Sequence, residues 1–435
     1  MRSSAVYKKI RKENPKMMNI DNYRILGENL AVSNDTWETQ NNNNDLIIGT
    51  TGSGKTRSYV MTNILNSKDS MIITDTKGNL YKKLNSRLKE KGFDVKLIDF
   101  TNFKNSTVGY NPFDFLGYEE DGIVSELDIR KLSKVVCPRC VFDREPFWQD
   151  SARDYMECMV SYVKDFTPEN EHHFGTVYKL ATLMDSGRFT ELMRDAEEKL
   201  PDGLVAKRYP QIISNAGADR MHASIKGFVY QNLSSLNTKE AVRFYKRQDR
   251  IDFKELGKKP TALFLIVSDT DRSQDVFINL LYTQALQELV RFADLSEGSR
   301  LPVPVRFFLD DFASNFEIPD FDKIISVIRS REISVSLMIQ CIEQLTDIYG
   351  RSAGTTILEN CGTQIYLGGQ DPDTANYFGR KLNKTESTVL SMPRDMELVF
   401  IYGQKPIMNR KFDFGAHEAE LMSSESDKMG FEMAV

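Results

Sequence analysis

Short apolar runs alternate with longer amphipathic stretches along most of the chain. The first apolar run, Leu46–Ile48, precedes a glycine-rich segment and a predicted helix over Lys55–Leu65. A second run at Met71–Thr74 is followed by a charged helical pattern over Asn79–Lys91 and by a third strand at Val95–Asp99. Strands that alternate with helices are typical of βαβ units. The pattern therefore predicts an α/β fold with a mainly parallel sheet.

The strand pattern fades over residues 113–258 and returns afterwards. Long helical patterns cover Phe147–Phe166 and Phe174–Lys199 within this interval. The elements predicted downstream are strands at Ala262–Val267, Val305–Leu309, Ile333–Ile339, Gln364–Leu367 and Leu398–Tyr402, and helices over Ser273–Leu295 and Ile324–Ser330. We therefore expect one α/β domain built from residues 21–112 and 259–414, interrupted by an all-α domain over residues 113–258.

The two ends of the chain differ in composition from the rest. Residues 1–20 form a basic arm, which is either a solvated charged segment or a contact for anionic lipid or nucleic acid. Residues 415–435 are polar and rich in methionine, and we expect a flexible tail there.

Charge and hydropathy narrow the possible classes of function. The 435 residues include 57 Lys+Arg and 62 Asp+Glu, for a formal net charge of −5. This balance argues against a protein that coats nucleic acid over its whole surface, but it leaves room for a local basic channel. The longest apolar stretch, Ala262–Val267, is too short to span a membrane, and the polar amino terminus does not resemble a signal peptide. The five cysteines form no even framework, so we expect reduced thiols and a cytoplasmic protein.

A glycine-rich loop carries the strongest chemical signal. The segment from Gly49 to Thr56 fits G-x-x-x-x-G-K-[ST] completely and lies between a predicted strand and a predicted helix. Backbone N–H groups in such a loop turn inward around phosphate, and the positive end of the following helix adds to the attraction. We expect Lys55 to reach the β- and γ-phosphates of ATP and Thr56 to ligate Mg²⁺. The other predicted nucleotide contacts are the loop residues Thr51, Gly52, Ser53 and Gly54.

A nucleotide site of this kind also needs acidic residues that bind Mg²⁺ and activate water, and one acidic pair fits that role. Asp310 and Asp311 follow the apolar run Phe307–Leu309, so they are expected at the carboxyl end of a strand, where parallel α/β sheets bind ligands. Asp310 is the candidate Mg²⁺ carboxylate and Asp311 the candidate general base. A solvated acidic turn is the alternative. Asp75 competes for this acidic role, because it also ends an apolar strand.

Two further features fit ATP hydrolysis. Gln340 ends the predicted strand Ile333–Ile339, where its amide is suited to sense a γ-phosphate or hold the attacking water. Arg329 and Arg331 precede that strand, and Arg329 has no evident partner in its own chain. An arginine at a subunit interface can stabilise transition-state charge in a neighbouring copy. Without the glycine-rich loop, a structural amide and two solvated arginines would be the simpler interpretation.

Several short blocks occur in a characteristic order. They are Asn42-Asn43-Asn44, the glycine-rich loop, Asp75-Thr76-Lys77-Gly78-Asn79-Leu80, Tyr110-Asn111-Pro112-Phe113, Pro146-Phe147-Trp148, Leu309-Asp310-Asp311-Phe312-Ala313, Ile318-Pro319-Asp320-Phe321, Arg329-Ser330-Arg331 and the strand that ends at Gln340. In this order they resemble the type IV coupling proteins, ring ATPases that feed conjugative DNA and attached protein to a type IV secretion channel. The resemblance covers most of residues 21–413.

The resemblance implies a RecA-like P-loop NTPase fold with an inserted all-α domain, and ATP and Mg²⁺ as cofactors. It also implies a hexameric ring, with DNA and relaxosome or secretion-channel proteins as partners at the cytoplasmic face of the membrane. The implied roles are ATP contacts for Gly52, Ser53, Gly54, Lys55 and Thr56, metal and water binding for Asp310 and Asp311, sensing for Gln340 and a trans-acting arginine for Arg329.

The chain departs from the family pattern at three places. The family usually has Asp-Glu where this chain has Asp310-Asp311, and Asp-Pro-Lys-Gly-Glu where it has residues 75–79. The side chain of Asp311 is one methylene shorter than glutamate, so its activation of water is slower or relies on a neighbour. Most family members also begin with membrane-spanning helices, which the pattern here does not predict. A shorter branch of the family and a trimmed chain are the two explanations.

Weaker signals have plainer interpretations. Cys137 and Cys140 could form half of a zinc site with His172 and His173, but no second C-x-x-C is present, so unpaired thiols are favoured. Five basic residues are candidates either for a DNA channel or for an ordinary charged helix face: Lys239, Arg243, Lys246, Arg247 and Arg250.

The main functional hypothesis is an ATP-hydrolysing motor that recruits or pumps DNA and attached protein into a transfer apparatus. A soluble DNA translocase or helicase of the same superfamily is one alternative. A nucleotide-gated adaptor with little ATPase activity is the other.

Overall fold

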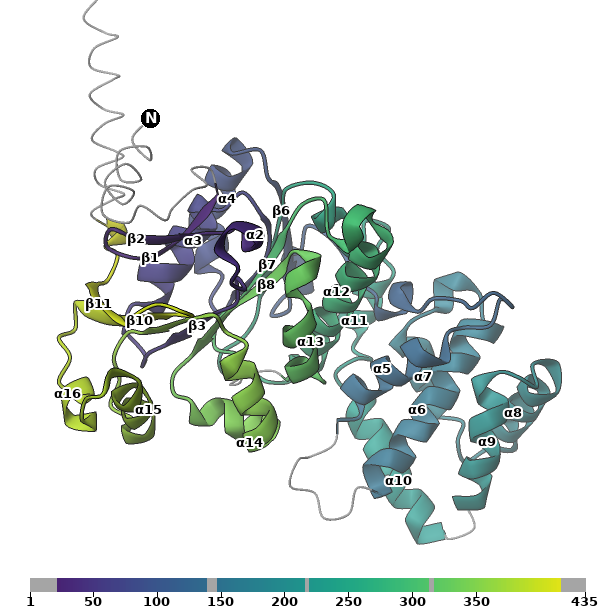
Figure 1. Ribbon diagram of the computed structural model, residues 1–435. Helices are drawn as coiled ribbons and strands as arrows, with labels where there is room; N and C mark the ends of the chain where they lie inside the picture. Colours follow the sequence, from purple (N-terminus) through teal and green to yellow (C-terminus); the bar gives the residue numbers. More distant parts are fainter. Residues whose placement is uncertain (1–21, 139–146, 216–218, 313–316, 416–435) are drawn as a thin grey trace, which may run out of the picture.

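The computed structural model describes residues 22–138, 147–215, 219–312 and 317–415. Within these residues nine strands form one sheet in the order β11-β10-β9-β3-β8-β7-β4-β6-β5 (Figure 1). The strands from β9 to β5 run parallel, whereas β10 and β11 are antiparallel to their neighbours. The bounds of these strands are β3 Asp45–Ile48, β4 Ser70–Asp75, β5 Asp94–Asp99, β6 Thr261–Ile266, β7 Val305–Leu309, β8 Ile333–Ile339, β9 Thr363–Tyr366, β10 Met396–Ile401 and β11 Ile407–Arg410.

The sheet is buried on both faces, as expected for parallel strands. Successive side chains of a strand point to opposite faces. On β3, Leu46 and Ile48 join the larger apolar cluster, whereas Ile47 joins a second cluster on the other face. The helices that contribute to the larger cluster in this part of the fold are α12 Asp275–Leu295, α13 Phe321–Val327, α14 Glu343–Glu359, α15 Pro372–Leu382 and α16 Glu386–Leu390. The opposite face is covered by α3 Met61–Asn66, α4 Asn79–Glu90 and the hairpin described next.

A separate two-stranded hairpin precedes the sheet. Strands β1 (Tyr23–Gly27) and β2 (Leu30–Ser33) pair antiparallel, and the short helix α2 (Thr36–Thr39) follows. A buried ion cluster ties the hairpin to the sheet: the guanidinium groups of Arg24 and Arg306 lie 2.8 and 3.2 Å from the Asp45 carboxylate. The sequence pattern did not predict this hairpin as a pair of strands.

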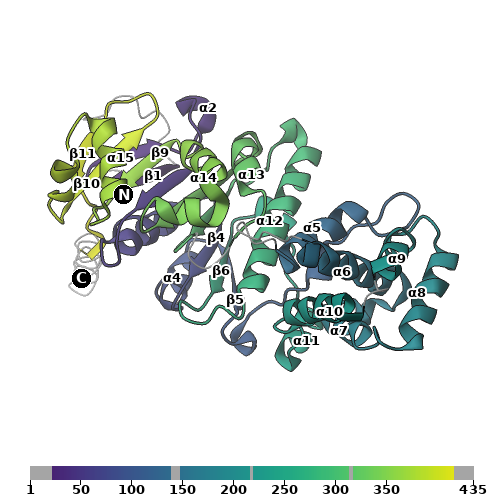
Figure 2. The same ribbon diagram turned by 90° about the horizontal axis from the view of Figure 1, so that it is seen from below.

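The chain leaves the sheet after β5 and returns to it at β6, and the interval is helical. The helices are α5 Glu126–Val136, α6 Phe147–Phe166, α7 Phe174–Ala181, α8 Gly187–Lys199, α9 Leu204–Asn215, α10 Asp219–Leu233 and α11 Lys239–Tyr245. Figure 2 shows that this all-α part extends to one side of the sheet, with α5 beside α12. Buried hydrogen bonds join the two parts, since Gln284 of α12 accepts from the Tyr110 hydroxyl and donates to the Pro112 carbonyl.

Two helix predictions are wrong in their extent. The pattern over Phe174–Lys199 is divided into α7 and α8, because residues 182–186 form a turn before Gly187 begins the next helix. The helix predicted over Ile324–Ser330 begins earlier, at Phe321, and ends at Val327. Arg329 and Arg331 then form a separate short turn before β8. The strands predicted at Val305–Leu309 and Ile333–Ile339 are confirmed residue by residue.

Candidate nucleotide site

A cleft of about 670 Å³ opens at the carboxyl ends of β3, β4, β7 and β8. Parallel α/β sheets bind their ligands at this edge. The lining residues are Thr50, Thr51, Gly52, Gly54, Lys55, Thr56, Arg57, Met61, Asp75, Thr76, Lys77, Asn79, Leu80, Lys83, Asp269, Asp310, Asp311 and Gln340. The structure thus brings the glycine-rich loop, the acidic pair and Gln340 to one cleft, although they are far apart in sequence. Ser53 and Arg329 are not among the lining residues.

The glycine-rich loop has the backbone that an anion cradle needs. Gly52 and Gly54 have φ angles of 79° and 101°, in the left-handed region that favours glycine. A Cβ atom on Gly52 would meet open space, so the loop faces the cleft without side-chain cover at this residue. A wide π-helical turn over Lys55–Val60 follows and continues as α3. The positive end of this helical segment therefore points into the cleft.

Lys55 is held inside the loop. Its Nζ atom donates a 2.5 Å hydrogen bond to the carbonyl of Gly49, and the side chain is buried. Burial lowers the pKa of Lys55, while the carboxylates of Asp311 and Asp310 raise it. The ammonium group is thus placed between the loop backbone and the acidic pair, where phosphate oxygens would replace the carbonyl as its partner.

Thr56 and Asp310 face each other across the cleft. The Thr56 Oγ1 atom lies 3.5 Å from Asp310 Oδ2, at the limit of hydrogen bonding. A hydroxyl and a carboxylate are hard oxygen ligands of the kind that Mg²⁺ prefers. The donor set therefore fits the predicted magnesium site, and the neighbouring loop fits the phosphates of a nucleotide.

The surroundings of the Asp310 carboxyl raise its pKa. The residue is only 8% exposed. Burial, followed by repulsion from Asp311, raises the pKa of Asp310 to about 6, although Lys55 opposes the rise. A divalent cation binds the ionised form, so cation binding at this residue releases a proton below about pH 6.

Asp311 and Gln340 complete the polar end of the cleft. Asp311 adopts a φ of 51°, unusual for a residue other than glycine, and its backbone N–H donates to Asp310 Oδ1. Strand β8 lies between β3 and β7, so Gln340 at its end is placed between the glycine-rich loop and the acidic pair. The backbone N–H of Gln340 donates to Gln344 Oε1, which anchors the start of α14.

Asp75 lines the cleft, but its carboxylate is already hydrogen-bonded to the backbone at the start of α4. It accepts hydrogen bonds from the backbone N–H groups of Tyr81 and Lys77, at 2.9 and 3.4 Å, and so holds the start of α4. Burial raises the pKa of Asp75, and these backbone donors oppose the rise. Asp75 is therefore better suited to position α4 than to act as a base.

Sequence reasoning missed four charged residues of the cleft: Arg57, Lys77, Lys83 and Asp269. Lys77 and Lys83 lie on or near α4, and Lys77 pairs with Asp269 at 3.6 Å. The signal that could have found Lys77 is its place in the block after β4.

Arg329 lies at the opposite end of the sheet from the cleft. It precedes the amino end of β8, whereas Gln340 follows the carboxyl end. The expectation that Arg329 has no partner in its own chain is wrong, because its guanidinium group donates a 3.4 Å hydrogen bond to the Thr36 carbonyl. Arg331 forms an ion pair with Asp294 at 2.7 Å. Neither arginine can reach the phosphate loop of its own chain.

The weaker signals resolve into structural contacts. His173 caps α7 by accepting from the Thr176 N–H, and His172 Nε2 lies 2.9 Å from the Thr167 carbonyl. Cys137 is buried and free, and Cys140 lies outside the described residues. The four described cysteines are free thiols. Three of the five basic candidates are ion-paired within the chain: Lys246 with Glu171, Arg247 with Asp249 and Arg250 with Asp114.

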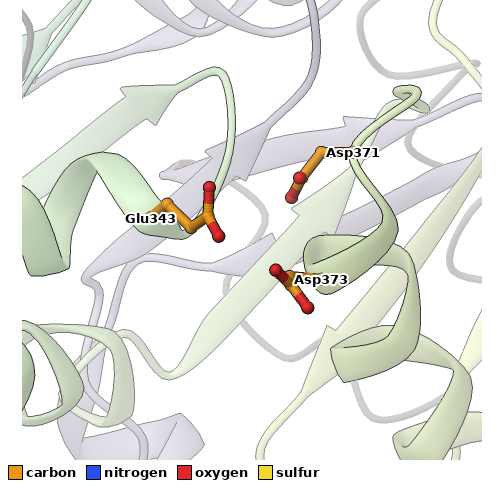
Figure 3. A group of neighbouring side chains, drawn as sticks. All are labelled: Glu343, Asp371 and Asp373. Atoms are coloured by element: carbon orange, nitrogen blue, oxygen red, sulfur yellow. The ribbon is translucent and has the colours of Figure 1, made fainter.

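An acidic trio lies just beyond Gln340. The carboxylate oxygens of Glu343, Asp371 and Asp373 approach within 4.8 Å of one another (Figure 3). A hydrogen bond that the protonated Glu343 carboxyl donates to Asp373, with repulsion from Asp371, raises the pKa of Glu343. Asp371 also caps α15 by accepting from the Thr374 N–H at 2.8 Å. These contacts account for the trio without a ligand.

Comparison with known proteins gives concordant matches. A family model described as type IV secretory system conjugative DNA transfer matches residues 6–387. The VirD4 protein of Agrobacterium fabrum is 26% identical over 365 residues, covering 80% of this chain and 51% of that protein. VirD4 of Rhizobium rhizogenes is 24% identical over 349 residues, covering 78% and 49%. The chain therefore spans about half the length of these curated relatives.

Solved structures agree in fold. The plasmid coupling protein TrwB in complex with ADP and Mg²⁺ superposes with a TM-score of 0.70 at 15% identity, covering 93% of this chain and 92% of that chain. VirB4 of Thermoanaerobacter pseudethanolicus gives a TM-score of 0.53, covering 91% and 97%. These matches confirm the predicted RecA-like P-loop α/β fold with an inserted all-α domain. Within the part of the chain that the structure covers, no helix is both long enough and apolar enough to cross a membrane.

Proposed function

Because the chain belongs to the family of type IV secretory system conjugative DNA transfer proteins, we propose that it is a Mg²⁺-dependent ATPase that couples DNA and attached protein to a secretion apparatus. The observation that carries the proposal is the convergence of Lys55, Thr56 and Asp310 in one cleft at the carboxyl edge of the sheet. Relatives with the same fold have been solved with ADP and Mg²⁺ and with the ATP analogue ADPNP, which supports a nucleotide as the ligand.

Each group of residues in the cleft has a separate role in ATP hydrolysis. Backbone N–H groups of the loop and the Lys55 ammonium bind and orient the phosphates. Thr56 and Asp310 would hold Mg²⁺, which would offset phosphate charge. Asp311 accepts the proton of the attacking water, and the Gln340 amide orients that water or the γ-phosphate from the neighbouring strand. Mg²⁺ binds the ionised form of Asp310, so we expect the affinity for Mg²⁺ to fall as pH drops below about 6.

The active form is an assembly of copies, in which Arg329 serves the cleft of a neighbouring copy. Arg329 is exposed and lies at the sheet end remote from its own phosphate loop. Two large apolar side chains near it are exposed: Trp37 is 61% exposed, and Val327 is 49% exposed. Exposed apolar side chains beside an arginine suit an interface between proteins. A hexameric ring, with DNA and transfer proteins as partners, is part of the proposal.

One observation favours the adaptor alternative. Asp311 stands where the family usually has glutamate, and its shorter side chain begins from a strained backbone. A chain with this substitution could bind nucleotide tightly and cycle slowly. The translocase alternative has no separate support among the described residues.

The experiment is ATP turnover measured against protein concentration, with and without single- and double-stranded DNA. The motor proposal predicts Mg²⁺-dependent turnover that rises per subunit as copies associate and rises again with DNA. Lys82→Ala is the matched control, because Lys82 is exposed on α4 outside the cleft. Tight ADP binding with no turnover under all these conditions would favour the adaptor. No binding of ADP or ATP would overturn both.

A further inference from the structure

The side chain of a lysine that follows β11 contacts the backbone of the glycine-rich loop. Lys411 follows β11, and its Nζ atom donates hydrogen bonds of 2.9 Å to the Ser53 carbonyl and 2.7 Å to the Leu367 carbonyl. Ser53 belongs to the glycine-rich loop, and Leu367 follows β9. One ammonium group therefore ties the loop to the sheet edge beside it.

Because the peptide bond is planar, this contact also fixes the direction of the neighbouring Gly54 N–H group. In a trans peptide the C=O and N–H groups point in opposite directions. The Ser53 carbonyl points toward Lys411, so the N–H of Gly54 in the same peptide unit points the other way. Gly54 lines the cleft, whereas Ser53 does not. The contact therefore turns the Gly54 N–H toward the space where phosphate would bind.

The loop needs an external restraint at this peptide. Gly54 has a φ of 101° and, as glycine, has low steric barriers to other backbone conformations. A flipped Ser53–Gly54 peptide would present a carbonyl oxygen to the phosphates, and the like partial charges would repel. The Lys411 bond opposes that flip, because the flip would leave a half-buried ammonium without one of its two acceptors.

The position of Lys411 is itself fixed. Its backbone N–H donates to the Asp395 carbonyl at 2.9 Å. Burial lowers the pKa of Lys411, and the nearby carboxyls of Glu397 on β10 and of Asp395 oppose that shift. A Cβ atom on Gly27 would lie only 1.9 Å from Glu397 Oε1, so the glycine leaves room for this carboxyl. The backbone hydrogen bond to Asp395 thus fixes the main chain at Lys411.

We propose that Lys411 is a positioning residue for nucleotide binding, which sets the Ser53–Gly54 peptide so that the Gly54 N–H faces the phosphates. This inference rests on the proposed function, since it needs a nucleotide in the cleft. Lys411 itself touches the loop backbone and not the substrate, so its effect passes through the loop.

The test compares Lys411→Met with Lys405→Met in the full chain, using a fluorescent ADP with Mg²⁺ as the probe. Lys405 is exposed in the turn between β10 and β11. We expect Lys411→Met to weaken ADP binding at least tenfold, Lys405→Met to leave it unchanged, and Lys411→Arg to restore most of the affinity. Backbone amide exchange of residues 52–56 without nucleotide should accelerate in Lys411→Met alone.

The outcomes separate this inference from the function. If wild type binds no ADP, the proposed function fails. If wild type binds and Lys411→Met binds equally well, only the role of Lys411 is overturned. If Lys411→Met does not fold, Lys411→Ala, which also lacks a donor group, replaces it. Wild-type affinity in a folded Lys411→Ala, together with unchanged amide exchange, would then contradict the inference.

Discussion

The Oγ1 atom of Thr56 and the Oδ2 atom of Asp310 lie 3.5 Å apart, although 254 positions separate the two residues in the sequence. The contact exists because β3 and β7 flank β8 in the sheet and end at the same edge. It unites the phosphate loop with a carboxylate across the interval that contains the whole all-α part.

Asp310→Asn should stabilise the fold while abolishing Mg²⁺-dependent nucleotide binding. The folded chain raises the pKa of Asp310 from 3.8 to about 6, so it holds this proton more tightly than the unfolded chain. The free energy of unfolding therefore falls as pH rises from about 4 to 6. At 1.36 kcal/mol per pKa unit, the upper bound of the cost is about 3 kcal/mol at pH 7.5.

Calorimetric melting at two pH values checks this prediction. Asp310→Asn should melt above wild type at pH 7.5 and level with it near pH 4. Asp202→Asn, at an exposed turn of the all-α part, is the control. A melting temperature below wild type at pH 7.5 would contradict the assigned environment of Asp310.

Asp311 should behave as the base. Asp311→Asn is expected to retain ADP binding and to lose about 100-fold or more in turnover, the usual contribution of a positioned base. Asp311→Glu, which restores the residue usual in the family, should match or exceed wild-type turnover. The check is a steady-state assay beside a binding titration. Full activity in Asp311→Asn would move the base elsewhere, with Asp75 the next candidate.

Arg329→Ala should bind ATP and lose most of its turnover, since a trans arginine can contribute about 10³-fold or more. Mixing Arg329→Ala with Lys55→Ala should restore part of the activity, because mixed interfaces pair an intact loop with an intact arginine. Arg331→Ala is the control, since Arg331 pairs with Asp294 of its own chain. Turnover per subunit that is independent of association, followed by light scattering, would refute the trans role.

The residues that line the cleft were easier to predict from the sequence than the contacts of residues outside it. Lys55, Thr56, Asp310 and Gln340 follow local patterns, a motif and strand ends, and the structure brings all of them to the cleft. Arg329 was predicted as free of its own chain, and the Thr36 carbonyl shows why such an expectation fails: the partner is a backbone atom nearly 300 positions away.

Elements whose patterns depend on tertiary contacts were harder to predict. The hairpin strand β1 is buried at every position, so it lacks the alternation that marks a half-exposed strand. Lys411 lies after an edge strand and resembles any surface lysine in sequence. Only the fold, which brings the residue after β11 to the loop that follows β3, gives it acceptors at Ser53 and Leu367.

Glu397→Gln should stabilise the fold at neutral pH. Glu397 is 1% exposed, and its Oε1 atom has no hydrogen-bond partner among the described residues. Burial raises the pKa of Glu397 to about 9. The free energy of unfolding therefore falls as pH rises from about 4.5 to 9. The glutamine variant should melt a few degrees above wild type at pH 7.5, and a difference that persists unchanged at pH 4 would contradict this assignment.

The most direct test of the account is calorimetric titration of ADP with Mg²⁺ into wild type, Lys55→Ala and Lys82→Ala. Lys55 is buried beside the loop and the acidic pair, and truncating a buried charge partner costs about 2 to 5 kcal/mol of binding. We predict one site in wild type and in Lys82→Ala, and affinity at least about 30-fold weaker in a folded Lys55→Ala. Equal affinity in all three proteins would contradict the nucleotide site.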